Sequence, residues 1–213
     1  MTRLVLDKNH KTNDGENFSQ IMEIFEENNL FTVTYRDPFF KIPFFEYFFS
    51  KLKKPVIVID FDLLYSGLVT SEIISLPENI TIIKPTKEDW NTTFKQLLLE
   101  ISEKEIIIVL DSLNSISSMF YETYNVGRWI NNTIMLLGSF AQKSNSKIII
   151  TGMVKPKEGK GFVLSNSGRQ FLDIPKMIQV NLQVKNFSLI LTQNNSKNSE
   201  KKSFSIPIKL TLS

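Results

Sequence analysis

The chain has 213 residues, a formal net charge of +3, 42% hydrophobic residues and 22% charged residues, which is the composition of an ordinary globular protein. It contains no cysteine and one histidine, His10. This excludes a disulfide framework, a thiolate zinc site, and a catalytic triad or metal centre built on several histidines.

No apolar run in the sequence is long enough to cross a bilayer, and the first residues lack the apolar centre of a signal peptide. We therefore expect a cytoplasmic protein that makes no membrane contact.

The charges are distributed unevenly along the chain. From residue 141 to the end there are 12 lysines or arginines against three acidic residues, a net +9, so residues 1–140 carry −6. Such polarity favours either an anionic partner at the basic part or head-to-tail self-association. A basic surface that is simply solvated is the alternative.

The first 28 residues precede the regular pattern and predict a leader helix. Its apolar positions are Ile21, Met22, Ile24 and Phe25. From residue 29 to 152, short apolar runs rich in β-branched residues alternate with helix-length segments. The strand-like runs are residues 31–35, 55–60, 80–84, 105–111 and 147–151. Such runs are typical of parallel strands that are buried on both faces.

Two segments between these runs show helical spacing of apolar residues. Residues 88–103 place Trp90, Phe94, Leu97, Leu98 and Ile101 on one face, and residues 126–143 do so with Trp129, Thr133, Leu136, Leu137 and Phe140. The alternation predicts an α/β fold with a doubly wound, mostly parallel sheet flanked by helices.

The pattern changes in the last third of the chain. Residues 153–170 are interpreted as a basic, flexible loop, and residues 171–213 as antiparallel strands that extend the sheet. The strand candidates are residues 176–184, 187–192 and 203–212, with a tight turn at Asn186. Pro207 demotes the last strand to an edge or a bulge. Because no linker or repeat divides the sequence, we predict that residues 1–213 form a single domain.

Residues 31–49, FTVTYRDPFFKIPFFEYFF, have the strand, loop and helix order of a phosphate-binding loop, G-x-x-x-x-G-K-[ST]. When Lys41 is aligned with the motif lysine, Tyr35 and Phe40 replace the two glycines and Ile42 replaces the hydroxyl residue. The glycines let backbone N–H groups surround a phosphate, and the hydroxyl holds magnesium. We therefore expect neither ATP nor magnesium as a cofactor.

Two later strand ends carry acidic residues. Residues 59–62 read Ile-Asp-Phe-Asp and residues 110–113 read Leu-Asp-Ser-Leu. With Lys41 before them and the strand at residues 147–151 after them, these motifs follow the order of the RecA/RadA/KaiC recombinase-type ATPase core. From about residue 29 onward the chain resembles this family, and its closing part resembles archaeal RadA paralogues with a degenerate Walker A motif. The resemblance implies a RecA-like fold, in which the nucleotide-binding remnants would be Lys41, Asp62, Asp111 and Ser112.

The departures from the family pattern bear on activity. Asp62 stands where the family has its water-activating glutamate, and Gly152 and Met153 replace the polar residue that senses the nucleotide phosphate. Together with the missing loop glycines, they predict a pseudo-ATPase that is not an enzyme. Two alternatives remain open: a cryptic ATPase that uses Lys41, Asp62 and Asp111, and a structural subunit of an Elongator-like ring that contacts RNA.

Asp60, Asp62 and Asp111 all follow strands, at the usual site position of an open α/β sheet. Magnesium accepts such ligands, but normally together with substrate phosphates. We therefore interpret these residues as helix caps or strand ends and predict no metal site. Ser112 is interpreted as a helix N-cap, because the one histidine of the sequence, His10, is interpreted as a solvated residue of the polar leader and not as a base.

The basic loop is the candidate nucleic-acid-binding site. Lys155, Lys157 and Lys160 are spaced so that they can reach successive phosphates. Phe162 offers a face for base stacking, and Arg169 adds a charge or a stacking plane. In the family that the chain resembles, loops of this region contact single-stranded DNA. The predicted partners are single-stranded DNA, with RNA as the second option, and either a recombinase paralogue or further copies of the chain.

Aromatic residues dominate the segment after residue 38. Phe44, Phe45, Phe48 and Phe49 form a wide stripe on one predicted helix, which indicates core packing. Phe39 and Phe40 precede that helix, and in ring- or filament-forming relatives this loop lies at the subunit interface. We therefore predict these two residues as interface anchors.

Overall fold

The computed structural model describes residues 2–6, 19, 22–23, 25–158, 161–165, 178–185, 188–194 and 202–212. The strands are β1 (Thr2–Leu6), β2 (Leu30–Tyr35), β3 (Val56–Asp60), β4 (Ile80–Ile83), β5 (Ile107–Asp111), β6 (Lys147–Lys157), β7 (Gly161–Leu164), β8 (Ile178–Lys185), β9 (Ser188–Asn194) and β10 (Lys202–Leu212). The α-helices are α2 (Lys41–Lys51), α3 (Leu64–Thr70), α4 (Trp90–Glu103), α5 (Leu113–Met119) and α6 (Val126–Ser144).

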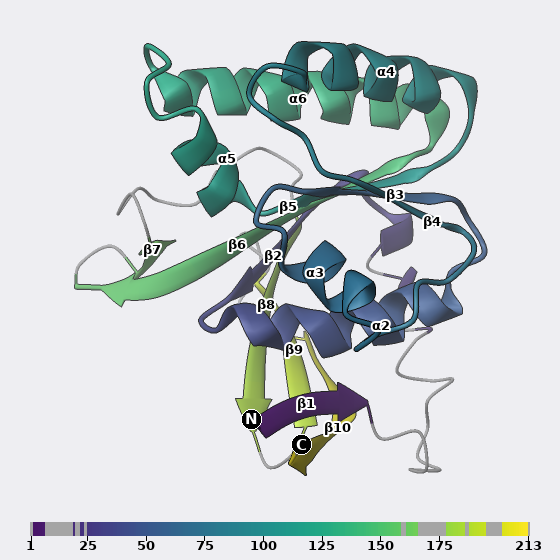
Figure 1. Cartoon of the computed structure of the whole chain (residues 1–213), viewed down its shortest axis with the longest axis vertical. Coiled ribbons are helices and arrows are strands. Elements are labelled where there is room, and N and C mark those ends of the chain that lie inside the picture. The colour runs from purple at the N-terminus through teal and green to yellow at the C-terminus, as the bar shows by residue number, and fades with distance from the viewer. Residues whose placement is uncertain are drawn as a thin grey trace.

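Ten strands of the described residues form one mixed sheet in the order β1-β10-β9-β8-β2-β6-β5-β3-β4, with β7 paired to β6. The central strands, in the order β4, β3, β5, β6, β2 and β8, pair parallel with one another. Helices α4 and α6 cover one face of this parallel part, and α2 and α3 cover the other (Figure 1). The predicted α/β fold, a doubly wound and mostly parallel sheet with an antiparallel C-terminal extension, is confirmed.

The burial of β3 explains why its sequence is a continuous apolar run. Val56 and Val58 belong to the hydrophobic cluster on the α2 side of the sheet. Ile57 and Ile59 belong to the cluster on the α4 and α6 side. Because successive side chains of a strand point to opposite faces, a strand covered on both sides needs apolar residues at every position.

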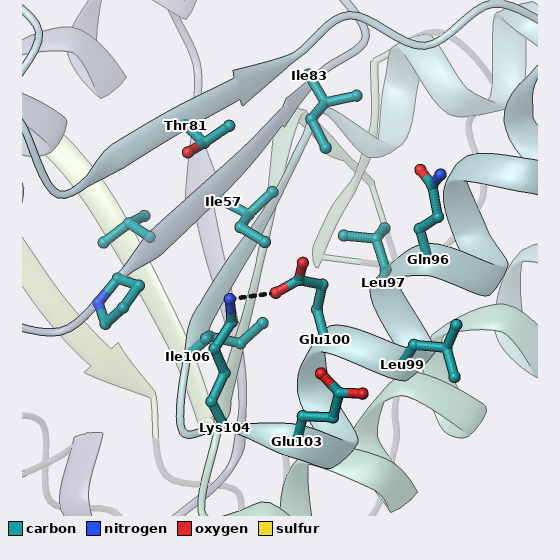
Figure 2. A pocket seen from close by; sticks show the side chains of 12 residues that line it. Ile57, Thr81, Ile83, Gln96, Leu97, Leu99, Glu100, Glu103, Lys104 and Ile106 are labelled. Carbon is teal, nitrogen blue, oxygen red and sulfur yellow. Dashed lines mark ion pairs between the residues drawn. The ribbon is translucent and has the colours of Figure 1, made fainter.

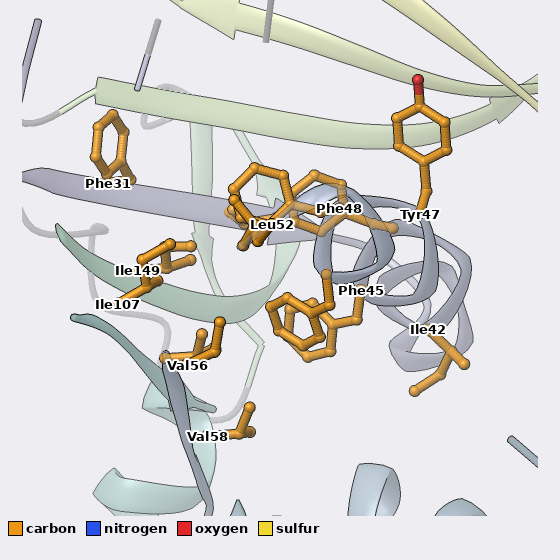
Figure 3. Packing of buried hydrophobic residues seen from close by; sticks show 14 of the residues in the cluster. Phe31, Ile42, Phe45, Tyr47, Phe48, Leu52, Val56, Val58, Ile107 and Ile149 are labelled. Carbon is orange, nitrogen blue, oxygen red and sulfur yellow. The ribbon is translucent and has the colours of Figure 1, made fainter. Parts of the chain in front are cut away.

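Helix α2 packs its phenylalanine stripe against the sheet, as the sequence predicts. Phe44, Phe45, Phe48 and Phe49 are at most 1% exposed, and Figure 3 shows the helix beside β-branched residues of the strands. The rings stack at a spacing of four residues, with centroid distances of 5.5 Å for Phe44–Phe48 and 4.9 Å for Phe45–Phe49. This aromatic packing fixes the position at which α2 begins.

On the opposite face, α4 buries Trp90, Leu97 and Ile101 as predicted. In α6 the predicted apolar face is partly right. Leu137 is buried, and Trp129 and Phe140 are partly buried and pack against the cluster on this side of the sheet. The buried residues are Ile130, Ile134, Leu137 and Ala141, whereas Leu136 is 42% exposed. Both sets have helical spacing, and packing against β6 and α4 selects the set with the smaller residues.

The prediction of a helical leader over residues 1–28 is wrong at its start. Residues 2–6 form strand β1, which pairs antiparallel with β10. A helix does include Met22 and Phe25, and both pack against the α2-side cluster. Ile21 and Ile24 lie outside the described residues. The strand was missed because a single short apolar run gains its partner only from the far end of the chain.

The C-terminal strands lie close to their predicted positions. Lys185 pairs with Ser188, which places the connection between β8 and β9 at residues 186–187; Asn186 itself lies outside the described residues. The interpretation of β10 as an edge or bulged strand is only partly right. In the strand order β10 lies between β9 and β1, but each of its halves pairs on one side only. It pairs with β9 up to Pro207 and with β1 from Ile208 onward. Proline, which lacks an N–H group, thus occurs where the strand changes partner.

The boundary between the predicted core and the basic loop also needs correction. Strand β6 continues to Lys157 instead of ending at residue 151, because its second half pairs antiparallel with β7. Lys155 and Lys157 therefore lie on a strand and not in a flexible loop. Among the described helices, none has both the length and the apolar character of a membrane span.

Candidate functional site

Lys41 is the first residue of α2, and its side chain is completely buried. Its Nζ donates hydrogen bonds to Asp62 Oδ2 at 2.6 Å and to Asp111 Oδ2 at 2.7 Å. A lysine in a loop is usually solvated, and that general expectation fails here because the aromatic packing of α2 holds the residue against the sheet. The structure thus brings together three of the four predicted remnants.

The partners of Lys41 come from neighbouring strand ends. Asp111 ends β5 and pairs in register with Asp60 at the end of β3, and Asp62 follows two residues later. Thr151 on β6 donates a hydrogen bond of 2.5 Å to Asp111 Oδ1. Tyr35, the last residue of β2, places its ring 5.8 Å from Lys41 Nζ. The carboxyl ends of four parallel strands therefore meet at one buried amine.

Burial and charge act against each other in this network. Burial raises the pKa of Asp111 to about 6, and the charge of Asp62 adds to this while Lys41 opposes it. Burial alone would lower the pKa of Lys41, but Asp111, Tyr35 and Asp62 more than offset it, so the pKa of Lys41 is raised above its ordinary value. Burial, followed by the charge of Asp111, also raises the pKa of Tyr35. Lys41 is therefore the permanent cation of the site.

Asp60 has no exposed surface. Its Oδ2 accepts a hydrogen bond of 2.7 Å from the backbone N–H of Ser66, whereas its Oδ1 has no hydrogen-bond partner within the described residues. Burial raises the pKa of Asp60. One carboxylate oxygen each of Asp60, Asp62 and Asp111 lie within 4.8 Å of one another. These three acids and Lys41 form what we call the strand-end cluster.

The segment between β2 and α2 is closed on itself. A 3-10 turn over Pro38–Phe40 connects them. The backbone N–H of Phe39 donates to Asp37 Oδ1 at 2.9 Å, and that of Phe40 donates to the Asp37 carbonyl at 3.1 Å. Two amides that precede the helix are therefore already satisfied, and neither of their residues is a glycine.

Ser112 occupies the N-cap position of α5, as predicted, but its side chain makes no capping hydrogen bond to the helix backbone. Its hydroxyl oxygen lies 3.2 Å from that of Ser115. The fourth predicted remnant thus adjoins Asp111 in sequence without a bond to Lys41.

Of the predicted nucleic-acid-binding residues, the structure places Lys155 and Lys157 in the last part of β6, beyond Thr151. Lys155 and Lys157 are exposed. The register pairs Lys155 with Val163, and Pro156 with Phe162. Lys160, Arg169 and the side chain of Phe162 lie outside what the structure describes, so the binding role of this set stays a prediction.

Of the predicted interface anchors, Phe39 is 45% exposed. Phe40 is partly buried and packs against the α2-side cluster. Their role at an interface also stays a prediction.

A separate groove of about 550 Å³ lies between strands β3 and β4 and helix α4. Figure 2 shows Ile57 and Ile83 of the strands facing Leu97 of the helix, with the Lys104–Glu100 ion pair at one end. None of the predicted site residues lines this groove, so it is distinct from the strand-end cluster.

Two solved structures have a similar fold. The RadB recombinase superposes with a TM-score of 0.54 at 14% identity, over 83% of this chain and 86% of that chain. A DnaB-like replicative helicase, described with its interactions with primase, superposes with a TM-score of 0.55 at 10% identity, over 84% of this chain. The matched region is only 55% of the helicase chain. The likeness shows a RecA-like fold, as the sequence motifs indicate.

Sequence comparison adds nothing to this structural likeness, since no family model and no curated protein matches the chain.

The residues present do not fit the magnesium nucleotide that the fold implies. A phosphate at the start of α2 needs free N–H groups, yet those of Phe39 and Phe40 are bonded to Asp37. It also needs a lysine able to reach it, yet Lys41 is held by two carboxylates. Ile42, buried in the position of the hydroxyl ligand, offers no oxygen.

Tyr35 and Thr151 belong to the site but were not predicted as site residues. Thr151 lies on β6, which is next to the strand of Asp111, and Tyr35 lies on β2, which is next to β6. The ends of parallel strands meet at one edge of a sheet, so both residues could have been placed near Asp111 if the strand order were known. The sequence alone does not give that order.

Proposed function

We propose that this chain is a RecA-fold accessory protein that acts without ATP hydrolysis and binds single-stranded nucleic acid in DNA recombination, repair or replication. The observation that carries the proposal is the engagement of Lys41 by Asp62 and Asp111 inside the protein. A lysine held in this way is not available to a nucleotide phosphate.

The DNA-related part of the proposal is supported by the structural neighbours, one a recombinase and the other a replicative helicase. The exposed lysines Lys155 and Lys157 support a phosphate-binding surface near the carboxyl ends of the parallel strands. The protein partner would be a recombinase paralogue or further copies of this chain.

Calorimetry with Mg-ATP tests the loss of nucleotide function. We expect no affinity tighter than about 1 mM and no turnover, because the phosphate-binding groups are already bonded within the protein. A micromolar dissociation constant, or hydrolysis that disappears in Asp111→Asn, would establish the cryptic ATPase instead.

Fluorescence anisotropy with labelled oligonucleotides tests nucleic-acid binding. Single-stranded DNA should bind with little sequence preference, and the affinity should fall steeply between about 50 and 200 mM salt. The triple variant Lys155→Ala, Lys157→Ala, Lys160→Ala should flatten the logarithmic salt slope by about two units, at about 0.7 per phosphate contact.

The matched control removes the same charge elsewhere. Lys87, Lys95 and Lys104 are exposed, and their replacement by alanine should leave the salt slope unchanged. An absence of binding at low salt would contradict the proposal, and a preference for RNA would favour the Elongator-like alternative.

A further inference from the structure

The strand-end cluster contains three carboxylates and one ammonium group. Lys41 Nζ lies 2.6 Å from Asp62 and 2.7 Å from Asp111, and oxygens of Asp60, Asp62 and Asp111 lie within 4.8 Å of one another. Three carboxylate oxygens at such separations are ligands that a hard divalent cation prefers. In this chain the ammonium group of Lys41 provides the positive charge between these carboxylates.

Asp60 provides a second observation that points to a cation. The residue is completely buried, and its Oδ1 has no hydrogen-bond partner in the described part of the chain. A buried acceptor without a partner is costly, and native structures rarely keep one. Lys41 donates hydrogen bonds to Asp62 and Asp111, and none to this oxygen of Asp60.

We propose that the ammonium group of Lys41 occupies, in place of a metal ion, a divalent-cation site formed by Asp60, Asp62 and Asp111. The ammonium group takes the place of the metal, so the native chain offsets part of the negative charge at this end of the sheet without binding a cation. The inference deepens the proposed function, on which it rests, by explaining how a RecA-like fold holds its strand ends together without a magnesium nucleotide.

The test measures Mn²⁺ binding by the loss of the free-ion signal in electron paramagnetic resonance. In Lys41→Met the stem of the side chain is kept and the charge is removed. We expect this variant to bind one Mn²⁺ with a dissociation constant below about 1 mM, the weak end of the range for oxygen-ligand cation sites. The native protein should leave the Mn²⁺ signal unchanged.

Two further variants make the result specific. Lys87→Met removes an exposed, ion-paired lysine far along the chain and should not bind Mn²⁺. Adding Asp60→Asn to Lys41→Met should weaken Mn²⁺ binding at least about tenfold, the lower limit for losing a residue at a metal site.

Several outcomes would overturn the proposal. One is Mn²⁺ binding by the native protein as tight as that of Lys41→Met, and another is a folded Lys41→Met that binds none. If Lys41→Met is unfolded, Mn²⁺ at millimolar concentration should restore the circular dichroism spectrum of the folded protein. A variant that stays unfolded with Mn²⁺ would contradict the proposal that Lys41 replaces a metal ion. Native binding of Mg-ATP would instead overturn the proposed function and leave the Mn²⁺ result standing.

Discussion

At the scale of single residues, the Lys41 ammonium group cannot exchange its two carboxylate partners for water, because its side chain has no exposed surface. Removing one partner of a buried ion pair typically destabilises a protein by about 3–5 kcal/mol, because the other charge is left buried and unpaired. Breaking the network should therefore destabilise the fold, and its protonation should affect stability.

The pH dependence of stability should report on Asp111. Its folded pKa of about 6 lies above its ordinary value of 3.8, so between these values the folded protein holds a proton that the unfolded chain has released. The free energy of unfolding should thus fall as pH rises from 4 to 6, by roughly 1–3 kcal/mol relative to Asp111→Asn. Urea denaturation across this range measures the difference in slope.

Glu122 supplies a control with the opposite sign. It is exposed, and its hydrogen bond with Lys87 lowers its pKa, so its small contribution is lost as pH falls. Glu122→Gln should keep the native decrease between pH 4 and 6. If Asp111→Asn keeps that decrease as well, Asp111 is not its source.

At the scale of elements, the side chain of Asn114 connects α5 to β6 through two hydrogen bonds. Asn114 donates from Nδ2 to the Met153 carbonyl at 3.1 Å and accepts from the Met153 N–H at 2.7 Å. This pair of bonds fixes the helix that follows Asp111 to the strand that carries Thr151.

Asn114→Ala should therefore destabilise the protein by about 1–3 kcal/mol, because the Met153 N–H loses its side-chain acceptor in a partly buried setting. The Met153 carbonyl keeps its hydrogen bond from the Ser165 N–H. Hydrogen exchange should show lost protection at the Met153 amide. Asn132→Ala, at an exposed position of α6, is the matched control and should change stability by less than about 0.5 kcal/mol. Equal protection of Met153 in both variants would contradict the role of Asn114.

The elements that the sequence predicted correctly are those with a strong local pattern. Strands β3 and β5 and helix α4 have continuous or periodic apolar residues, and their boundaries differ by only a few positions from those predicted. Strand β1 and the second half of β6 were missed because each depends on a partner strand, β10 and β7, that only the folded chain supplies. The short helices α3 and α5 lack a full period of apolar residues, and only the start of α5 was predicted, through Ser112 as its N-cap.

At the scale of the whole molecule, the order of the motifs was enough to predict a RecA-like fold and to group Lys41, Asp62 and Asp111. The burial of Lys41 was not predictable, because it depends on how the phenylalanines of α2 pack against the sheet. That the chain forms a single domain stays a prediction, as does its assembly.

Assembly is the property to which the charge distribution points. With −6 on residues 1–140 and +9 on the rest, copies of the chain should attract one another head to tail, and such heterologous contacts build rings or filaments. Exposed charges are screened over about 8–10 Å at physiological salt. Light scattering should therefore show a mass above that of a monomer at low salt, which decreases as salt is added.

Phe39, exposed beside the start of α2, should contribute an apolar anchor to this contact. Phe39→Ser should weaken association at least about tenfold, the effect of 1.4 kcal/mol, without changing the unfolding midpoint. Tyr124 is 90% exposed on another turn, so Tyr124→Ser is the matched control and should associate like the native protein. A strict monomer at roughly tens of micromolar in low salt, combined with no binding to a recombinase partner, would contradict the predicted assembly.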